Sequence, residues 1–223
     1  MKLLVDHADI NLIKEMYEYY PVCGVTTNPT ILTKSGRAPY EVLKEIRSFI
    51  GKDADLHAQV VSEDAEGMIR EAHNILRELG DNTFVKIPVN REGLKAIRLL
   101  AKDDIRITGT GVYTTAQVYL AGEAGAAYAA PYVNRIDGLA QDGVAVVKAM
   151  QDIIDNNGMM IELLAASFKN TRQVMELAQY GIGAATCPPD VIEGLLFNDS
   201  VNAAVAAMNR DFHAAYGADT YMG

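Results

Sequence analysis

The hexapeptide Phe84-Val85-Lys86-Ile87-Pro88-Val89 places a single lysine among five apolar residues. Its valines, isoleucine and phenylalanine favour a β-strand. Burial of a charged lysine is costly, because desolvation penalises the ammonium and lowers its pKa. That cost is understandable if the amine must be neutral enough to attack a carbonyl, as a Schiff-base lysine does. The alternative for this stretch alone is a lysine at a strand end whose amine extends to water.

On both sides of this stretch, short apolar runs alternate with amphipathic helical segments. In the first unit, Asp9 is expected to cap a helix with Ile13 and Met16 on one face. Eight strand–helix units follow one another without a break, which indicates a parallel sheet covered by helices. The predicted strands are 3–6, 24–29, 56–60, 84–89, 105–110, 128–133, 161–167 and 184–187, and the predicted helices are 9–19, 30–34, 40–50, 63–79, 91–102, 114–124, 139–156, 171–180 and 190–197.

Eight units are the number that closes a (β/α)₈ TIM barrel, so the predicted fold is α/β, with a single catalytic barrel domain over residues 1–199. A doubly wound open sheet is the alternative, but no glycine-rich phosphate loop follows the first strand. Residues 200–223 are predicted to form an additional C-terminal helix and tail. A finished barrel does not need this helix, so its apolar face should be buried across the barrel mouth or on a neighbouring subunit.

Composition narrows the class of protein. The chain has 223 residues, 49% of them hydrophobic and 22% charged, as in an ordinary globular protein. A net charge of −9 argues against nucleic acid or an anionic membrane surface as a partner. Two cysteines provide no disulfide framework, the N-terminus does not resemble a signal peptide, and no apolar run reaches the roughly 18 residues of a membrane helix. We therefore expect a cytoplasmic protein.

Hydrogen-bonding side chains follow nearly all of the predicted strands. In a TIM barrel the chemistry lies at the C-terminal ends of the strands, so these side chains should converge on one rim. Each of these side chains, taken alone, could be an ordinary helix cap or loop residue. That interpretation does not explain why nearly every strand ends in one. The four histidines have no metal-ligand spacing and are interpreted as incidental, and no carboxylate cluster suggests a metal. The strand-end residues are Asp6, Thr26, Asn28, Gln59, Lys86, Thr110, Tyr132, Asn134, Arg135, Ser167 and Lys169.

Five motifs, in order along essentially the whole chain, resemble the transaldolase family. Gln59 and Tyr132 make the chain most similar to the fructose-6-phosphate aldolase subgroup, because transaldolases proper carry glutamate and phenylalanine there. The small transaldolases, which share the fold and the lysine, are the nearest alternative. The motifs are Val25-Thr26-Thr27-Asn28-Pro29-Thr30, Val85-Lys86-Ile87-Pro88, Thr108-Gly109-Thr110, Ala130-Pro131-Tyr132-Val133-Asn134-Arg135 and Ala165-Ala166-Ser167-Phe168-Lys169.

The resemblance implies a role for each catalytic position. Lys86 would form the Schiff base with a ketose, so that the iminium accepts electrons when the C3–C4 bond breaks. Asp6 would contact the hydroxyls of the donor and help to move the C4-hydroxyl proton. Gln59, Thr110 and Tyr132 would position a catalytic water.

The substrate-binding positions follow from the same resemblance. Asn28, with Thr26, would hold substrate hydroxyls. The phosphate-binding positions are Arg135, Ser167 and Lys169; transaldolases proper have an arginine in place of Lys169, so phosphate binding here is expected to be weaker or less bidentate. Ala130 stands where transaldolases proper have a serine, which removes one hydrogen bond to the donor.

The resulting expectation is a class I aldolase that cleaves fructose 6-phosphate to dihydroxyacetone and glyceraldehyde 3-phosphate and catalyses the reverse addition. No metal or organic cofactor is implied. A transaldolase, which transfers the dihydroxyacetone unit between sugar phosphates, is the first alternative, and a non-catalytic sugar-phosphate-binding barrel is the second. The resemblance also implies a homo-oligomer, a decamer built from rings.

Overall fold

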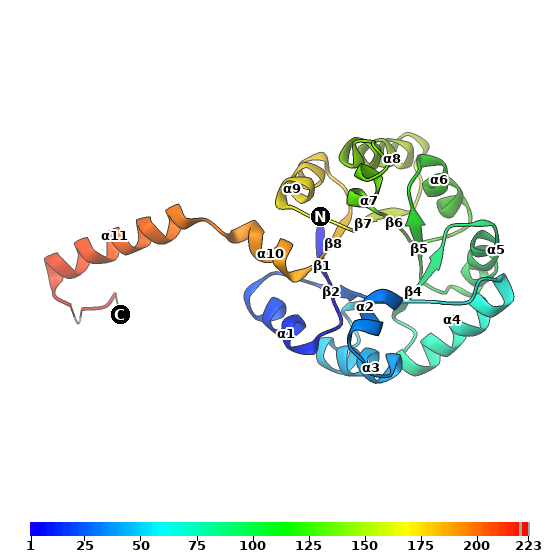
Figure 1. Ribbon diagram of the computed structural model, residues 1–223, viewed down its shortest axis with the longest axis horizontal. Coiled ribbons are helices and arrows are strands. Elements are labelled where there is room, and N and C mark those ends of the chain that lie inside the picture. The colour runs from blue at the N-terminus through cyan, green and yellow to red at the C-terminus, as the bar shows by residue number, and fades with distance from the viewer. Residues whose placement is uncertain (219, 223) are drawn as a thin grey trace.

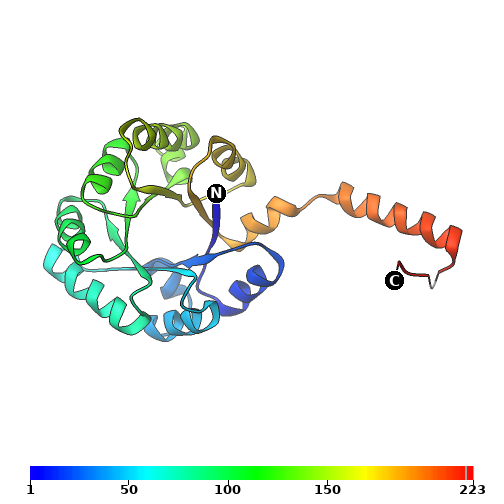
Figure 2. The same cartoon turned by 180° about the vertical axis from the view of Figure 1, so that it is seen from behind.

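The computed structural model describes residues 1–218 and 220–222, and over these residues eight parallel strands close into a barrel in the order β1 to β8 (Figure 1). The helices surround the strands as an outer ring, and the view from behind shows the same closed ring (Figure 2). The predicted TIM barrel is therefore confirmed, and the open sheet is wrong. The strands are β1 (Lys2–Asp6), β2 (Gly24–Thr26), β3 (Asp55–Gln59), β4 (Thr83–Pro88), β5 (Ile107–Val112), β6 (Tyr128–Pro131), β7 (Glu162–Ala165) and β8 (Ala184–Cys187).

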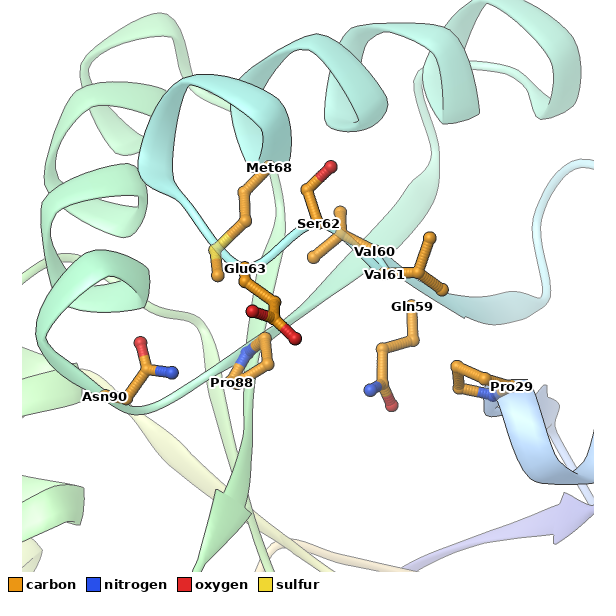
Figure 3. A pocket seen from close by; sticks show the side chains of 9 residues that line it. All are labelled: Pro29, Gln59, Val60, Val61, Ser62, Glu63, Met68, Pro88 and Asn90. Atoms are coloured by element: carbon orange, nitrogen blue, oxygen red, sulfur yellow. The ribbon is translucent and has the colours of Figure 1, made fainter.

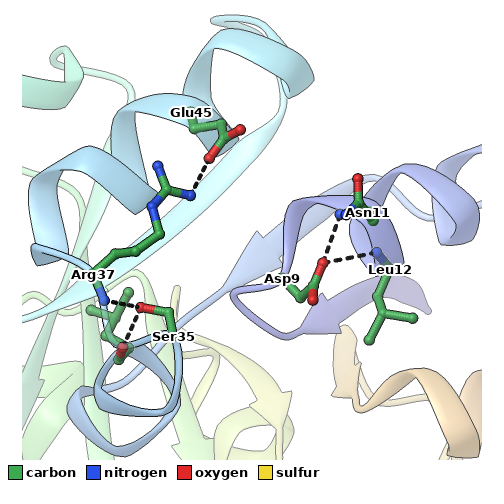
Figure 4. Close-up of polar contacts among 7 residues, drawn as sticks. Asp9, Asn11, Leu12, Ser35, Arg37 and Glu45 are labelled. Carbon is green, nitrogen blue, oxygen red and sulfur yellow. Dashed lines mark hydrogen bonds and ion pairs between the residues drawn. The ribbon is translucent and has the colours of Figure 1, made fainter.

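Most helices begin at a side-chain cap. Asp9 precedes α1, and its Oδ1 accepts hydrogen bonds from the N–H groups of Asn11 and Leu12 (Figure 4). Asparagines cap four further helices in the same way, so helix starts are set locally by the sequence. The helices are α1 (Ile10–Tyr19), α2 (Pro29–Lys34), α3 (Pro39–Ile50), α4 (Ala65–Leu79), α5 (Arg91–Leu100), the 3₁₀ turn η1 (Ala101–Asp103), α6 (Thr115–Glu123), α7 (Val133–Asp137), α8 (Gly143–Asn157), α9 (Thr171–Tyr180), α10 (Pro189–Leu196) and α11 (Asp199–Tyr216).

The sixth unit differs from its prediction. The strand ends at Pro131, and the short helix α7, which was not predicted, follows at once. The N–H groups of Val133 and Asn134 donate to the carbonyls of Ala166 and Ser167, so this turn is held against the end of β7. The next helix begins at Gly143 rather than near residue 139, because Asp142 caps it and its Oδ1 accepts from Ala145 N–H at 3.0 Å.

The fifth strand is also displaced from its prediction. It runs two residues further than expected, to Val112, and has an irregularity in its pairing with β6 between Gly109 and Val112. Gly111 has a φ of +68°, which a residue with a side chain adopts only at a cost. This bulge lies beside Thr110, a predicted site residue, and bulges at barrel rims commonly redirect side chains.

The C-terminal helix α11 extends away from the barrel in both views (Figures 1 and 2). None of its residues, all within the described part of the chain, is buried. Val201 is 56% exposed and Met208 is 60% exposed, so the apolar face has no cover in the single chain. The expectation that this helix crosses the mouth of its own barrel is wrong. Within the described residues, no helix is both long enough and apolar enough to cross a bilayer.

Candidate active site

Lys86 lies near the C-terminal end of β4 with its side chain inside the barrel. It is 4% exposed, and its Nζ donates a hydrogen bond of 2.8 Å to the backbone carbonyl of Thr27. Burial lowers the pKa of Lys86 from its ordinary value, and the charge of Asp6 opposes that shift. The amine is therefore held in one place and is easier to deprotonate than an exposed lysine, as nucleophilic attack on a carbonyl requires.

Asp6, the last residue of β1, is the acidic partner of this lysine. Thr26 Oγ1 donates to Asp6 Oδ1 at 2.7 Å, and Thr186 Oγ1 lies 2.7 Å from Thr26 Oγ1. Burial raises the pKa of Asp6, while Lys86 and the Thr26 hydrogen bond oppose the rise. Lys86 and Asp6 are thus both shifted toward their neutral forms by the same apolar surroundings, an arrangement typical of groups that exchange protons.

Thr110 and Tyr132 meet across the end of β5. The Thr110 Oγ1 lies 2.7 Å from the Tyr132 hydroxyl oxygen. Gln59, the third member of the predicted trio, is the register partner of Lys86, so it approaches the lysine from β3. Its Oε1 is buried and accepts no hydrogen bond from the described residues. Because such an oxygen costs about 1–3 kcal/mol when left unpaired, the position is suited to a donor supplied by water or a ligand.

The predicted phosphate residues follow β6 and β7. Arg135, in α7, places its guanidinium 4.5 Å from the centroid of the Tyr132 ring. Ser167 follows β7 with a φ of +62°, and its carbonyl accepts from Asn134 N–H at 3.0 Å. A non-glycine residue in this conformation is strained, and such strain often marks a functional position. The α7 turn therefore brings the segments of Arg135 and Ser167 together.

Lys169 follows Ser167 by two residues on the loop between β7 and α9. Its backbone N–H donates to Gln173 Oε1 at 3.0 Å, and the residue lines a cavity of about 920 Å³ beside α1, α10 and the start of α11. Lys169 therefore lies on the same loop as Ser167 and also borders this cavity.

Two predicted binding residues also have structural roles. Asn28 caps α2, where its Oδ1 accepts from Ile31 N–H at 3.0 Å, which leaves its amide NH₂ free to donate to a ligand. Ala130 is buried in β6 two residues before Tyr132 and presents only a methyl group. Asn28 could therefore donate to a ligand oxygen, whereas Ala130 can shape the cavity but cannot form a side-chain hydrogen bond.

His57, one of the four histidines interpreted as incidental for lack of metal-ligand spacing, is a core residue of the barrel. This residue is fully buried inside the barrel, stacks on Phe84 with ring centroids 4.6 Å apart, and lies 2.9 Å through Nδ1 from Thr108 Oγ1. Burial lowers the pKa of His57 well below its ordinary value, and nearby Lys86 lowers it further. The two-residue period of a strand could have identified it, because His57 lies on the same face as Gln59.

Comparison with known proteins agrees with this geometry. The family model for transaldolase/fructose-6-phosphate aldolase matches residues 3–221. A protein from Streptococcus pneumoniae, named "Probable fructose-6-phosphate aldolase", is 39% identical over 213 residues, which cover 95% of this chain and 96% of that protein. The chain therefore belongs to the transaldolase/fructose-6-phosphate aldolase family.

Proposed function

We propose that this protein is a class I aldolase that cleaves fructose 6-phosphate to dihydroxyacetone and glyceraldehyde 3-phosphate and catalyses the reverse addition. The observation that carries the proposal is the Lys86 amine, buried in the barrel and hydrogen-bonded to the Thr27 carbonyl. Burial lowers the pKa of Lys86, which increases the neutral fraction able to attack a ketone. The name of the Streptococcus pneumoniae relative supports the same substrate.

In the first half-reaction, the Lys86 amine adds to the C2 carbonyl of the ketose, and loss of water gives the iminium. A base then removes the C4-hydroxyl proton, the C3–C4 bond breaks, and its electron pair moves into the iminium to form an enamine. Glyceraldehyde 3-phosphate leaves with the new aldehyde at the former C4. We assign the base role to Asp6, because burial raises the pKa of this carboxyl and thereby makes its carboxylate a better proton acceptor.

In the second half-reaction, C3 of the enamine takes a proton and water hydrolyses the resulting imine, which frees dihydroxyacetone and the Lys86 amine. We assign the positioning of this water to Thr110, Tyr132 and Gln59. Thr110 and Tyr132 are already hydrogen-bonded to each other, so one of the two hydroxyls donates within the pair and the other keeps a free proton. The unpaired Gln59 Oε1 supplies an acceptor on the lysine's other side.

The remaining predicted residues bind the substrate in this proposal. Arg135 and Ser167 hold the 6-phosphate, with the arginine plane supported by the Tyr132 ring. The amide NH₂ of Asn28 donates to a substrate hydroxyl, and Thr26 acts through its hydrogen bond to Asp6. Lys169 contributes a second positive charge from the neighbouring loop.

A transaldolase is the alternative function, since the matched family model includes both activities. The two reactions are the same up to the enamine and differ in whether a proton or an acceptor aldehyde takes it. Fructose 6-phosphate cleavage with and without erythrose 4-phosphate distinguishes them. Release of free dihydroxyacetone without the acceptor supports the aldolase, whereas turnover only in its presence replaces the aldolase with a transaldolase.

We also propose that α11 contacts a second copy of the chain, with a decamer as the expected assembly. The support is that its apolar side chains are uncovered in the single chain, whereas most of the stability of a helix in a protein comes from packing of its apolar face. The residues on this face are Val201, Val205, Met208 and Phe212. A cytoplasmic location stays a prediction.

A further inference from the structure

Two buried threonine hydroxyls lie next to Asp6, the proposed base. Thr26, on β2, is 0% exposed and Thr186, on β8, is 2% exposed, and their Oγ1 atoms are 2.7 Å apart. The strands β2 and β8 are the two neighbours of β1 in the barrel (Figure 1). Thr26 is the register partner of Asp6, whereas Thr186 is the register partner of Leu4, two residues earlier on β1. The two side chains therefore meet across the inner face of β1, beside the Asp6 carboxylate.

The number of available protons sets the direction of these hydrogen bonds. An ionised carboxylate can only accept, so the single hydroxyl proton of Thr26 is donated to Asp6 Oδ1, at 2.7 Å. The bond between the two threonines then requires Thr186 to be the donor. We call this directed series, from Thr186 to Thr26 to Asp6 Oδ1, the threonine chain. Hydrogen bonds in such a series strengthen one another, because each donor is polarised by the bond that it accepts.

Several other groups act on the Asp6 carboxyl. Burial raises its pKa, and the groups that oppose this rise are Lys86 on β4, the Thr26 hydroxyl, His7 directly after β1 and Arg135 on α7. The neighbouring thiol of Cys187, on β8, has its pKa raised by burial and by the charge of Asp6, so it stays protonated. Of these groups, the Thr26 hydroxyl is the one that Thr186 controls directly, through the threonine chain.

Gln59, the register partner of Lys86, shows the opposite arrangement. In the cavity beside β3 and β4, its side chain lies between Pro29 and Pro88 (Figure 3). Its buried Oε1 accepts no hydrogen bond from the described residues. The proposed water-binding group is thus left unpaired, whereas the proposed base, Asp6, is oriented by the threonine chain before a ligand arrives.

We propose that Thr186 is a positioning residue for the reaction: through Thr26 it holds Asp6 Oδ1, so that Oδ2 takes the C4-hydroxyl proton. The proposal rests on the proposed function, in which Asp6 is the base. As the proton moves to Oδ2, the O–H electron pair forms the carbonyl of the leaving aldehyde. The C3–C4 bond breaks, and its electron pair moves into the iminium. The proton passes from Oδ2 to solvent after the aldehyde has left, while Oδ1 keeps its hydrogen bond from Thr26 throughout.

Thr186→Val tests this role on the full-length protein, because valine keeps the shape of threonine and removes the donor. Without that donor, Thr26 is a weaker hydrogen-bond donor to Asp6, so the pKa of Asp6 should rise. The acid limb of kcat for fructose 6-phosphate cleavage should move up by about half a pH unit, so that kcat on this limb falls about threefold. Thr186→Ala removes the same hydroxyl and should give the same shift. Thr186→Ser restores the hydroxyl and should return the limb to its wild-type position.

Thr83→Val is the matched control. Thr83 is also buried, at the start of β4, and its hydroxyl donates to the Leu79 carbonyl at 3.3 Å. The control should lower the unfolding free energy but leave the acid limb unmoved, because this hydroxyl is not part of the threonine chain. A merely structural role of Thr186 would make the two valine variants alike. Borohydride trapping of dihydroxyacetone at Lys86 should persist in every variant, because the amine is untouched.

A second measurement does not depend on turnover. NMR titration of protein labelled with ¹³C at the aspartate carboxyl carbons gives the pKa of Asp6, whose signal is identified by its loss in Asp6→Asn. This pKa should be about half a unit higher in Thr186→Val than in wild type, and unchanged in Thr186→Ser and Thr83→Val.

An equal pKa of Asp6 in Thr186→Val and wild type overturns the proposal, and so does an acid limb that moves as far in Thr83→Val. If the pKa of Asp6 shifts as expected but wild type does not cleave fructose 6-phosphate, the proposed function fails and the role of Thr186 in the reaction falls with it. The two failures are distinguishable, because the NMR titration reports the threonine chain whether or not the substrate is cleaved.

Discussion

The barrel and α11 differ in whether their apolar side chains are buried. Each helix from α1 to α10 turns apolar side chains onto the sheet, and the strands enclose an interior that ends at Lys86 and Asp6. The 18 residues of α11 lie apart and bury none of their side chains within the described structure. The barrel thus buries its own apolar side chains, whereas those of α11 are left uncovered in the single chain. We infer that catalysis and assembly are separable properties of this protein.

The largest expected effect concerns the barrel. Lys86→Met should reduce fructose 6-phosphate cleavage to an undetectable level, because methionine fills a similar space but has no amine to form the imine. The variant should keep its fold and its oligomeric mass, since removal of a buried amine leaves α11 untouched. Steady-state assays, circular dichroism and light scattering measure these properties. Substantial residual turnover would contradict the Schiff-base mechanism.

The second prediction concerns removal of α11. Deletion from Ser200 onward should lower the oligomeric mass measured by light scattering, because the exposed apolar face is removed. Trapping of dihydroxyacetone at Lys86 should persist, because no predicted catalytic residue lies beyond the barrel. An unchanged mass would disprove the role of α11 in assembly. Loss of trapping in a folded truncated protein would show that the two regions are not separable.

Within the barrel, Tyr132→Phe should lower dihydroxyacetone release at least about tenfold, or roughly 1.4 kcal/mol of barrier. Phenylalanine keeps the ring beneath Arg135 but removes the hydroxyl that is paired with Thr110. Imine formation at Lys86 should persist, and erythrose 4-phosphate should recover part of the turnover by accepting the enamine. The comparison of release with and without this acceptor tests the prediction, and equal release by variant and wild type would contradict it.

The smallest expected effect is on stability, through His57. Burial lowers the folded-state pKa of His57 well below its ordinary value, helped by the positive charges of Lys86, Arg47 and Lys2. The unfolded chain therefore takes up a proton that the folded chain does not, and stability is lost as the pH falls below about 6.5, the ordinary value for histidine. One such proton corresponds to at most about 1.4 kcal/mol per pH unit.

His57→Phe keeps a ring stacked on Phe84 and should flatten this acid dependence of the unfolding free energy, measured by urea titration between about pH 7 and pH 5. At pH 7 the variant should be less stable by about 1 kcal/mol, because the buried Thr108 hydroxyl loses its partner. Adding Thr108→Val removes both partners and should restore most of that loss. An unchanged acid slope in His57→Phe would show that another group causes it.

The sequence predicts much of this structure because local rules and the global fold agree. The Asp9 cap, the α9 range and the β8 range are confirmed as predicted, since each depends on neighbouring residues alone. The rule that chemistry lies at strand ends correctly places Lys86 inside the barrel and joins Thr110 to Tyr132.

Features that depend on contacts between distant segments could not be predicted in this way. The helix α7 forms where backbone groups after β6 meet those after β7, and nothing in its own five residues requires it. The role of His57 depends on Phe84 and Thr108, which lie on two other strands. Lys169 lines a cavity together with residues of α1, α10 and the start of α11, and its own loop does not specify these neighbours.

The most direct test of the account is borohydride reduction of the wild-type protein with dihydroxyacetone, followed by mass analysis of its peptides. The predicted result is one covalent adduct on the peptide that contains Lys86, and none on the same peptide of Lys86→Met. An adduct on another lysine, or no adduct under conditions where fructose 6-phosphate is cleaved, would contradict the claim that the buried lysine of β4 is the nucleophile.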